Sequence, residues 1–207
     1  MKTTLILIFL LPVFVLSQTT VELDFIAPFS DNLAAVKKGD LWGFINNKGN
    51  IVIDFRDDLV LTETNGYQYP IFKNKRCLIL ENKNGIAYFG YIDETGKTVI
   101  APEFLNALNF ETNVTLVLKV LSQTVGENDI LKKPVVYHNY FEVIIDSNGT
   151  IIEYLNPKGI NVVLDKEFLK KPPIITSRFI SDNIVTIMNE NKKWRPGFIS
   201  CNLFRIL

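Results

Sequence analysis

The chain of 207 residues contains 22 basic and 22 acidic side chains, so its formal net charge is zero. A nucleic-acid-binding domain usually presents a basic face, and the balanced charge gives no support for a nucleic-acid partner. Hydrophobic residues make up 47% of the chain. A chain of this length and composition can bury a sizeable core, and it is typical of one domain or one continuous repeat array.

The N-terminal segment, residues 1–17, has the pattern of a secretory signal peptide. Lys2 is followed by an apolar run over residues 5–16, and Ser17 ends the segment at a typical cleavage position. The run is shorter than the roughly 20 apolar residues that a membrane span needs. We therefore predict an exported protein, periplasmic, surface-associated or secreted, whose mature chain is residues 18–207 and has no membrane span.

The mature chain begins with a strand pattern and reaches its clearest motif at residues 41–53. Residues 20–25 alternate polar and apolar side chains, which is typical of a half-buried strand. Further on, residues 46–49 read Asn-Asn-Lys-Gly between two apolar stretches. The side chain of Asn46 can bond the backbone two residues on, and Gly49 accepts a left-handed conformation. The motif predicts a hairpin with a glycine bulge.

The same motif recurs along the chain. Gly96 and Gly149 occupy the turn position in a second and a third copy, and Gly197 opens a fourth copy in which the turn glycine is replaced. An upstream marker, Ser-Asp-Asn at residues 30–32 and again at 181–183, precedes the first and the fourth copies. Two markers that recur in the same order indicate an internal repeat. The predicted repeats cover approximately residues 25–60, 69–108, 110–165 and 174–207.

This pattern resembles the WG-repeat proteins, a bacterial group named for a Trp-Gly pair followed by Phe-Ile-(Asp/Asn)-x-x-Gly. Residues 29–53 match closely, residues 90–104 form a second match, and only the first copy keeps the pair Trp42-Gly43. The resemblance implies tandem β repeats, usually in exported or surface-associated proteins, and no settled activity. We expect Trp42 in the core, with Gly43 leaving space for an aromatic neighbour. The structural repeat positions are Trp42, Gly43, Phe44, Gly49, Gly90, Tyr91, Gly96, Gly149 and Gly197.

The third predicted repeat is stretched. Its first strand, residues 114–121, is followed by a polar segment, residues 122–134, which we predict as a loop because lengthening a loop costs little entropy. Asn-Pro-Lys-Gly at residues 156–159 predicts a type I turn, and a strand at residues 160–164 is expected to complete an extra hairpin. Residues 165–171 allow one short helical turn. No segment has sustained helical periodicity.

These elements predict an all-β fold of tandem three-stranded antiparallel meanders. The repeats are expected to form an open stacked or superhelical array, in which each repeat covers the apolar face of its neighbour. The alternative is a small propeller-like closed ring, with residues 21–25 pairing near residues 204–207. Unequal repeat lengths favour the open array, because closure requires blades of similar size.

Residues that carry chemistry are few. His138 is the single histidine, and Cys77 and Cys201 are the two cysteines, so the ligands of most common zinc sites are missing. We expect the cysteines to be free, with a disulfide between them as the alternative in an oxidising compartment. Neither a Gly-x-Ser-x-Gly elbow nor a glycine-rich phosphate loop is present. The sequence therefore predicts no cofactor, no metal and no catalytic residue.

The leading functional hypothesis is a non-enzymatic binding or interaction module for a protein or glycan of the cell envelope. Repeat arrays present extended surfaces that suit such partners. One alternative is an enzyme that uses carboxylates, such as Glu22 and Asp24, on cell-wall or extracellular polymers. Another is a purely structural spacer, and the oligomeric state is left open. The candidate binding residues are aromatic side chains in or near connections: Tyr67, Tyr69, Tyr137, Tyr140 and Trp194.

Overall fold

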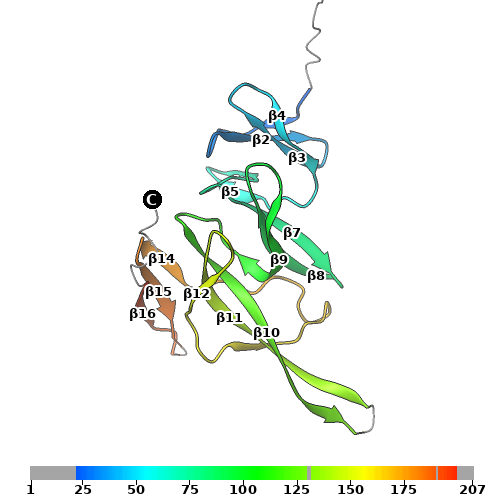
Figure 1. Ribbon diagram of the computed structural model, residues 1–207, viewed down its shortest axis with the longest axis vertical. Helices are drawn as coiled ribbons and strands as arrows, with labels where there is room; N and C mark the ends of the chain where they lie inside the picture. The colour runs from blue at the N-terminus through cyan, green and yellow to red at the C-terminus, as the bar shows by residue number, and fades with distance from the viewer. Residues whose placement is uncertain (1–21, 130–131, 190, 200–207) are drawn as a thin grey trace, which may run out of the picture.

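The computed structural model describes residues 22–129, 132–189 and 191–199, and within them the protein is all-β (Figure 1). No helix occurs in these residues. The strands form meanders that follow one another along the long axis of the molecule, as the predicted open array requires. The predicted signal peptide and residues 204–207, on which the closed ring depended, lie outside the described residues.

The first repeat is a four-stranded antiparallel sheet whose strands pair in chain order: β1 (Phe25–Ile26), β2 (Leu33–Lys38), β3 (Leu41–Asn46) and β4 (Ile51–Arg56). The strand expected at residues 20–25 thus begins only at Phe25. A small hairpin follows, built from β5 (Thr62–Thr64) and β6 (Tyr67–Tyr69).

The second and third repeats share one seven-stranded sheet, because β9 of the second repeat pairs with β10 of the third. Its strands are β7 (Cys77–Lys83), β8 (Ile86–Ile92), β9 (Thr98–Ala107), β10 (Val114–Asn128), β11 (Lys133–Asp146), β12 (Ile151–Tyr154) and β13 (Ile160–Val162). The fourth repeat forms a separate sheet from β14 (Arg178–Ser181), β15 (Ile184–Met188) and β16 (Trp194–Phe198).

The hairpin turns have the predicted geometry. The backbone N–H of Gly49 donates to the carbonyl oxygen of Asn46 at 2.9 Å, and Gly49 has a φ of 79°. The side-chain oxygen of Asn46 accepts from the backbone N–H of Lys48 at 3.0 Å. The turns that begin at Asp93 and Asp146 repeat this bonding. The prediction of a hairpin with a glycine bulge is therefore confirmed in three repeats.

The glycine of the repeat motif is required by a close approach of backbone. A Cβ added to Gly43 would lie 2.8 Å from the carbonyl oxygen of Ile53, closer than the ring of Phe55 at 3.4 Å. At Gly90 the added atom would lie 2.5 Å from the carbonyl oxygen of Ile100. The strand register shifts at both places, which marks a β-bulge. The aromatic neighbour expected beside Gly43 is present, but the facing backbone sets the requirement for glycine.

The glycine turns of the second and third repeats pack on the last strand of the preceding repeat, which is β4 for Gly96 and β9 for Gly149. A Cβ added to Gly96 would lie 3.2 Å from Cγ2 of Ile53. A Cβ added to Gly149 would lie 3.2 Å from Cγ2 of Ile100. The guanidinium of Arg56 also donates to the carbonyl oxygen of Gly96 at 3.0 Å. The same nearest-neighbour contact thus recurs at two junctions, as expected of a repeat array.

The core lies at the junctions between repeats. Phe44 of the first repeat packs edge-to-face on Phe72 of the second, with ring centroids 4.7 Å apart. Tyr91 of the second repeat packs in the same way on Phe110 of the third, at 4.9 Å. Trp42 is buried in the first of these clusters, as the sequence predicted. Because each cluster draws on two repeats, no repeat buries its apolar face alone.

Two predictions about the third repeat are wrong. Residues 122–134 were expected to form a loop, but β10 and β11 stay paired as far as Asn128 and Lys133. The β-branched residues Thr124 and Val125 favour a strand, and the continuous backbone pairing of β10 with β11 outweighs the polar average of the segment. The extra hairpin is also absent, because β13 does not pair with β12. Both strands pair with β11, at Val143 and His138 respectively, so the turn at 156–159 interrupts one edge of the sheet.

Burial also accounts for the state of the described cysteine. Cys77 lies in the first core cluster and forms no disulfide within the described residues. Its burial raises the pKa of the thiol well above the ordinary value, which keeps the thiol protonated and unreactive. Cys201 lies outside the described residues, so the absence of a disulfide between the two remains a prediction.

Candidate functional site

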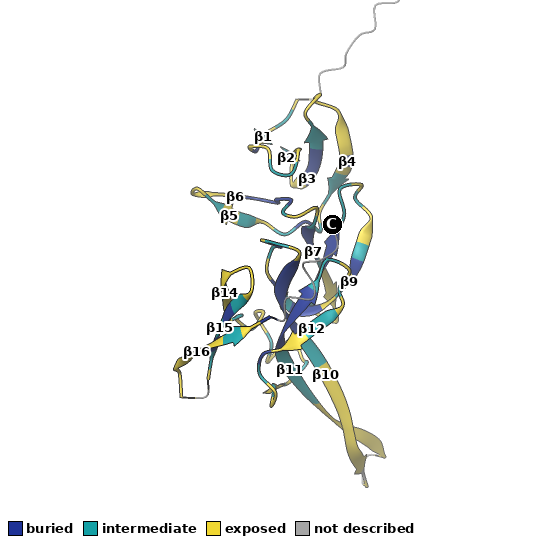
Figure 2. Ribbon diagram, turned by 60° about the vertical axis from the view of Figure 1, so that its left-hand side comes forward, coloured by how far each residue is buried: buried dark blue, intermediate teal, exposed yellow. Residues whose placement is uncertain are grey.

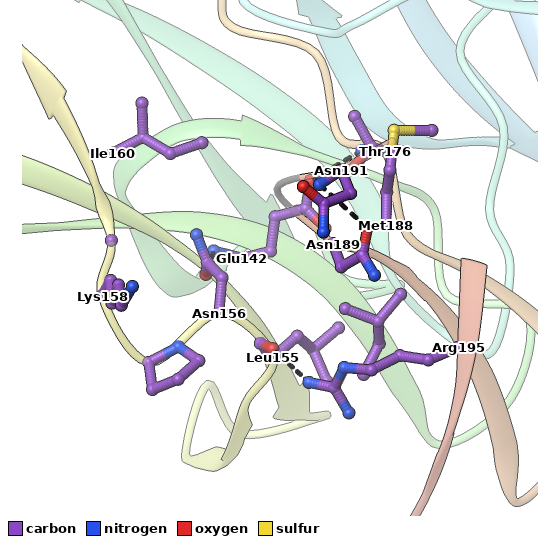
Figure 3. Close-up of a pocket in the computed structure, with 13 residues that line it drawn as sticks. Glu142, Leu155, Asn156, Lys158, Ile160, Thr176, Met188, Asn189, Asn191 and Arg195 are labelled. Atoms are coloured by element: carbon purple, nitrogen blue, oxygen red, sulfur yellow. Dashed lines mark hydrogen bonds between the residues drawn. The ribbon is translucent and has the colours of Figure 1, made fainter. Parts of the chain in front are cut away.

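A cavity of about 530 Å³ lies between the third and fourth repeats (Figure 3). One wall comes from β11, at Glu142, and from the connection between β12 and β13, at residues 155–160. The facing wall comes from β15, from the turn that follows it and from Arg195 on β16. The site is thus assembled from segments that are far apart in the sequence.

The cavity combines apolar and polar lining. Leu155, Ile160 and Ile187 contribute aliphatic surface, while Asn156 and Asn189 contribute side-chain amides. Ligand sites of proteins are typically built in this way, with a mostly apolar surface and a few polar groups that orient the ligand. The remaining lining residues are Glu142, Pro157, Lys158, Gly159, Thr176, Met188, Asn191 and Arg195.

Glu142 joins the two repeats that enclose the cavity. Its carboxylate accepts from the backbone N–H of Thr176 at 2.7 Å, from the hydroxyl of Thr176 at 2.8 Å and from the backbone N–H of Ser177 at 3.1 Å. Both Glu142 and Ser177 are buried. Hydrogen bonds to an ionised carboxylate are stronger than neutral ones, so this contact fixes the segment that leads into β14.

Arg195 and Lys158 give the mouth of the cavity positive charge. Both residues are exposed. A guanidinium carries five N–H donors, and Nη2 of Arg195 donates to the carbonyl oxygen of Leu155 at 3.1 Å. Among the described lining residues the single carboxylate is that of Glu142, whose oxygens already accept hydrogen bonds. The guanidinium of Arg195 therefore favours an anionic ligand.

The turn between β15 and β16 carries the side-chain amides of Asn189 and Asn191, and the side chain of Asn189 stabilises this turn. Oδ1 of Asn189 accepts from the backbone N–H of Asn191 at 3.0 Å and from that of Lys193 at 2.9 Å. Lys192 has a φ of 57° and takes the position that glycine holds in the other hairpin turns. The fourth repeat thus has the same kind of turn between β15 and β16, and this turn positions Asn189 and Asn191 in the wall of the cavity.

A second cavity, of about 600 Å³, lies beside the β5–β6 hairpin. It is lined by two carboxylates, Glu63 and Glu111, and by Lys73 and Arg178 among others. Glu111 forms an ion pair with Lys73 at 2.5 Å. This is the cavity to which the carboxylate-dependent enzyme hypothesis would apply, since acid–base catalysis on glycosides uses two carboxyl groups.

The five aromatic side chains predicted to bind a partner lie in three separate places. Tyr67 is 61% exposed and its ring centroid is 6.0 Å from that of Phe25, whereas Tyr69 is 4% exposed and belongs to the core. Tyr137 and Tyr140 lie on β11, and burial raises the pKa of Tyr140. Neither described cavity is lined by any of the five.

The exposed Trp194 contacts Arg178 and lines neither of the two cavities. The guanidinium carbon of Arg178 lies 5.6 Å from the centre of its ring, within the range of a cation–π contact. Trp194 and Arg195 are neighbours on β16, and side chains of neighbouring residues in a strand point to opposite faces. Trp194 therefore flanks the fourth repeat on the side away from Arg195 and its cavity.

His138 is paired with a serine on an exposed part of the sheet. Its Nδ1 lies 2.7 Å from Oγ of Ser122, across β10 and β11. A serine nucleophile also needs a group that orients the histidine and donors that stabilise an oxyanion.

Within the described part of the chain, no three His, Cys, Asp or Glu side chains gather in a way that would hold a metal ion.

The cavity residues escaped sequence reasoning, although one signal was present. Glu142 stands where the first repeat has Trp42 and the second has Phe89, so a charged residue replaces an aromatic at a buried position of the repeat. Such a replacement indicates a specific polar partner. The partner segment itself, at Thr176 and Ser177, carries no motif that would identify it.

One comparison with known proteins identifies WG repeats in the first part of the chain. A family model described as "WG containing repeat" matches residues 21–42, 42–74 and 89–119. Searches of curated proteins and of solved structures gave no match. In the described residues, no helix has the length and apolar character needed to cross a membrane.

Proposed function

The chain is a WG-repeat containing protein, and we propose that it is a non-enzymatic binding module of the cell envelope whose ligand is an acidic glycan. The ligand binds in the cavity between the third and fourth repeats. The observation that carries this proposal is the combination of an aliphatic surface, several amides and the guanidinium of Arg195 in one cavity.

The chemistry of the lining suits a sugar that carries a carboxylate. Carbon-bound hydrogens of a sugar ring can lie against Leu155 and Ile160. The side-chain oxygens of Asn156 and Asn189 already accept hydrogen bonds from backbone N–H groups, and their NH2 groups can donate to the hydroxyl groups of the sugar. A guanidinium binds a carboxylate through two parallel hydrogen bonds, which gives Arg195 the leading part in selecting the charge of the ligand. The volume of the cavity lies within the range of roughly 300–1,000 Å³ that ligand sites occupy.

The proposed location is supported by the sequence of the first 17 residues. A basic start and a short apolar run direct a chain to export. An exported protein meets the glycans of the envelope, so the proposed ligand and the proposed location agree.

Replacing Arg195 with Ala should weaken the binding of an acidic oligosaccharide by roughly 30-fold, because a charge-assisted pair of hydrogen bonds is lost. Isothermal titration with uronic-acid oligosaccharides and with their neutral counterparts measures this effect. The neutral sugars should bind less tightly and should be less affected by the substitution. Arg178→Ala is the matched control, since Arg178 belongs to the same repeat but does not line this cavity.

Two results of the titration would contradict the proposal. Equal binding of acidic sugars to the native protein and to Arg195→Ala would remove the cavity as their site. Failure of all acidic oligosaccharides to bind would remove the ligand class. An increase in reducing ends during the titration would instead support the alternative of a carboxylate-dependent enzyme.

A further inference from the structure

A two-stranded ribbon projects from the body of the molecule, as Figures 1 and 2 both show. It consists of residues 120–128 of β10 and 133–140 of β11, and it begins where β9 leaves β10. At its base, residues 138–140 of β11 also pair with β13. β9 pairs with β10 at Val117 and Lys119 and no further. Every residue from 121 to 127 is exposed.

The two edges of the ribbon differ in chemistry. Where β13 does not cover it, β11 carries Lys133 and Pro134, and an edge lysine and a proline both hinder pairing with another strand. The edge of β10 has neither between Lys119 and Glu127. Residues 120–126 read Val-Leu-Ser-Gln-Thr-Val-Gly, without charge or proline. An uncharged, exposed edge of this kind is a template for a further strand.

We propose that this edge pairs antiparallel with the same edge of a second copy of the chain, and so forms a dimer with Gln123 on the twofold axis. Such an interface is self-complementary, because each contact occurs twice. The register places Leu121 opposite Val125 and Ser122 opposite Thr124 of the second copy. Leu121 and Val125 are 44% and 53% exposed in the single chain, and in the dimer they cover each other. A shift by one residue would set Leu121 against Thr124 instead.

The ends of the paired segment support the same register. It confines the paired segment to residues 121–125 of each copy, between the last residue of β10 that pairs with β9 and the bulge that follows Thr124. Backbone pairing ends before Lys119, because Phe104 of β9 already pairs there. At the far end, the register of β10 against β11 shifts between Thr124 and Gly126, which marks a bulge that bends the strand away.

Sedimentation equilibrium of the purified protein tests the proposal through the residue on the axis. Gln123→Lys places two like charges directly opposite each other and should raise the dissociation constant of the dimer at least about tenfold. Gln123→Glu should do the same. An equimolar mixture of the two variants should restore the dimer as a heterodimer. Tyr137→Lys is the matched control, because Tyr137 lies directly across from Gln123 on β11 and leaves the edge of β10 unchanged.

A native protein that stays monomeric at every attainable concentration would overturn the proposal. Two folded variants whose mixture stays monomeric would do so too, since the restored dimer depends on opposite charges at the axis. A Gln123→Lys protein that dimerises as tightly as the native one would place the interface elsewhere. Restoration in the mixture would also show that both variants fold.

Discussion

Gly90→Ala is expected to lower the free energy of unfolding by about 3 kcal/mol, because a methyl group at this position overlaps the facing backbone. The added Cβ would lie 2.5 Å from the carbonyl oxygen of Ile100 and 2.7 Å from the nitrogen of Pro102. Both atoms belong to β9, which pairs on either side with β8 and β10, so the strand cannot move without loss of its pairing. Urea denaturation followed by circular dichroism measures the change.

Gly126→Ala is the matched control for this substitution. No atom lies within 4 Å of the position where its Cβ would stand, so the substitution introduces no overlap. A smaller loss of conformational entropy on folding should leave this variant as stable as the native protein or slightly more stable. Equal stability of Gly90→Ala and Gly126→Ala would contradict the close approach of β8 and β9.

Glu142→Ala should destabilise the protein by about 3 kcal/mol, because it leaves the buried N–H of Ser177 without an acceptor and also removes the two charge-assisted hydrogen bonds from Thr176. The carboxylate accepts three hydrogen bonds from these two residues. The loss should be local at first, since the contact holds the segment that enters the fourth repeat. Hydrogen exchange of β14 and β15 should therefore accelerate before that of β7 and β8.

Ser177→Ala separates the role of the carboxylate from a general sensitivity of this segment. The hydroxyl of Ser177 is buried without a hydrogen-bond partner among the described residues, while its backbone N–H, which the substitution retains, donates to Glu142. Removal of the hydroxyl should therefore leave the stability unchanged or raise it. If Ser177→Ala were as damaging as Glu142→Ala, the carboxylate would not be the group that joins the third and fourth repeats.

The parts of the fold that depend on local chemistry could be predicted from the sequence. An Asn or Asp at the first position of a turn and a glycine at the fourth close the turn through bonds between near neighbours, so the turns at Gly49, Gly96 and Gly149 follow from a few residues each. The open array follows from the recurrence of these turns. The requirement for glycine at Gly90 was visible, but the bulge on β9 that causes it was not.

The parts that depend on distant contacts could not be predicted. The sequence predicts a loop where the ribbon lies, because polar residues lower the average hydrophobicity of the segment, whereas the backbone pairing of β10 and β11 decides the structure. The cavity escaped notice because its walls meet only after the fourth repeat packs on the third. Tyr69 was expected at a surface, but the core between the first two repeats buries it.

The most direct test of the proposed ligand site is hydrogen exchange measured by mass spectrometry with and without a saturating uronic-acid oligosaccharide. We predict slower exchange at residues 155–160 and at residues 187–189, 191 and 195, which line the two walls of the cavity. Exchange around Phe25 and Tyr67 should stay unchanged. Slower exchange at that aromatic pair, or at no residue of either wall, would contradict the assignment of the ligand to the cavity between the third and fourth repeats.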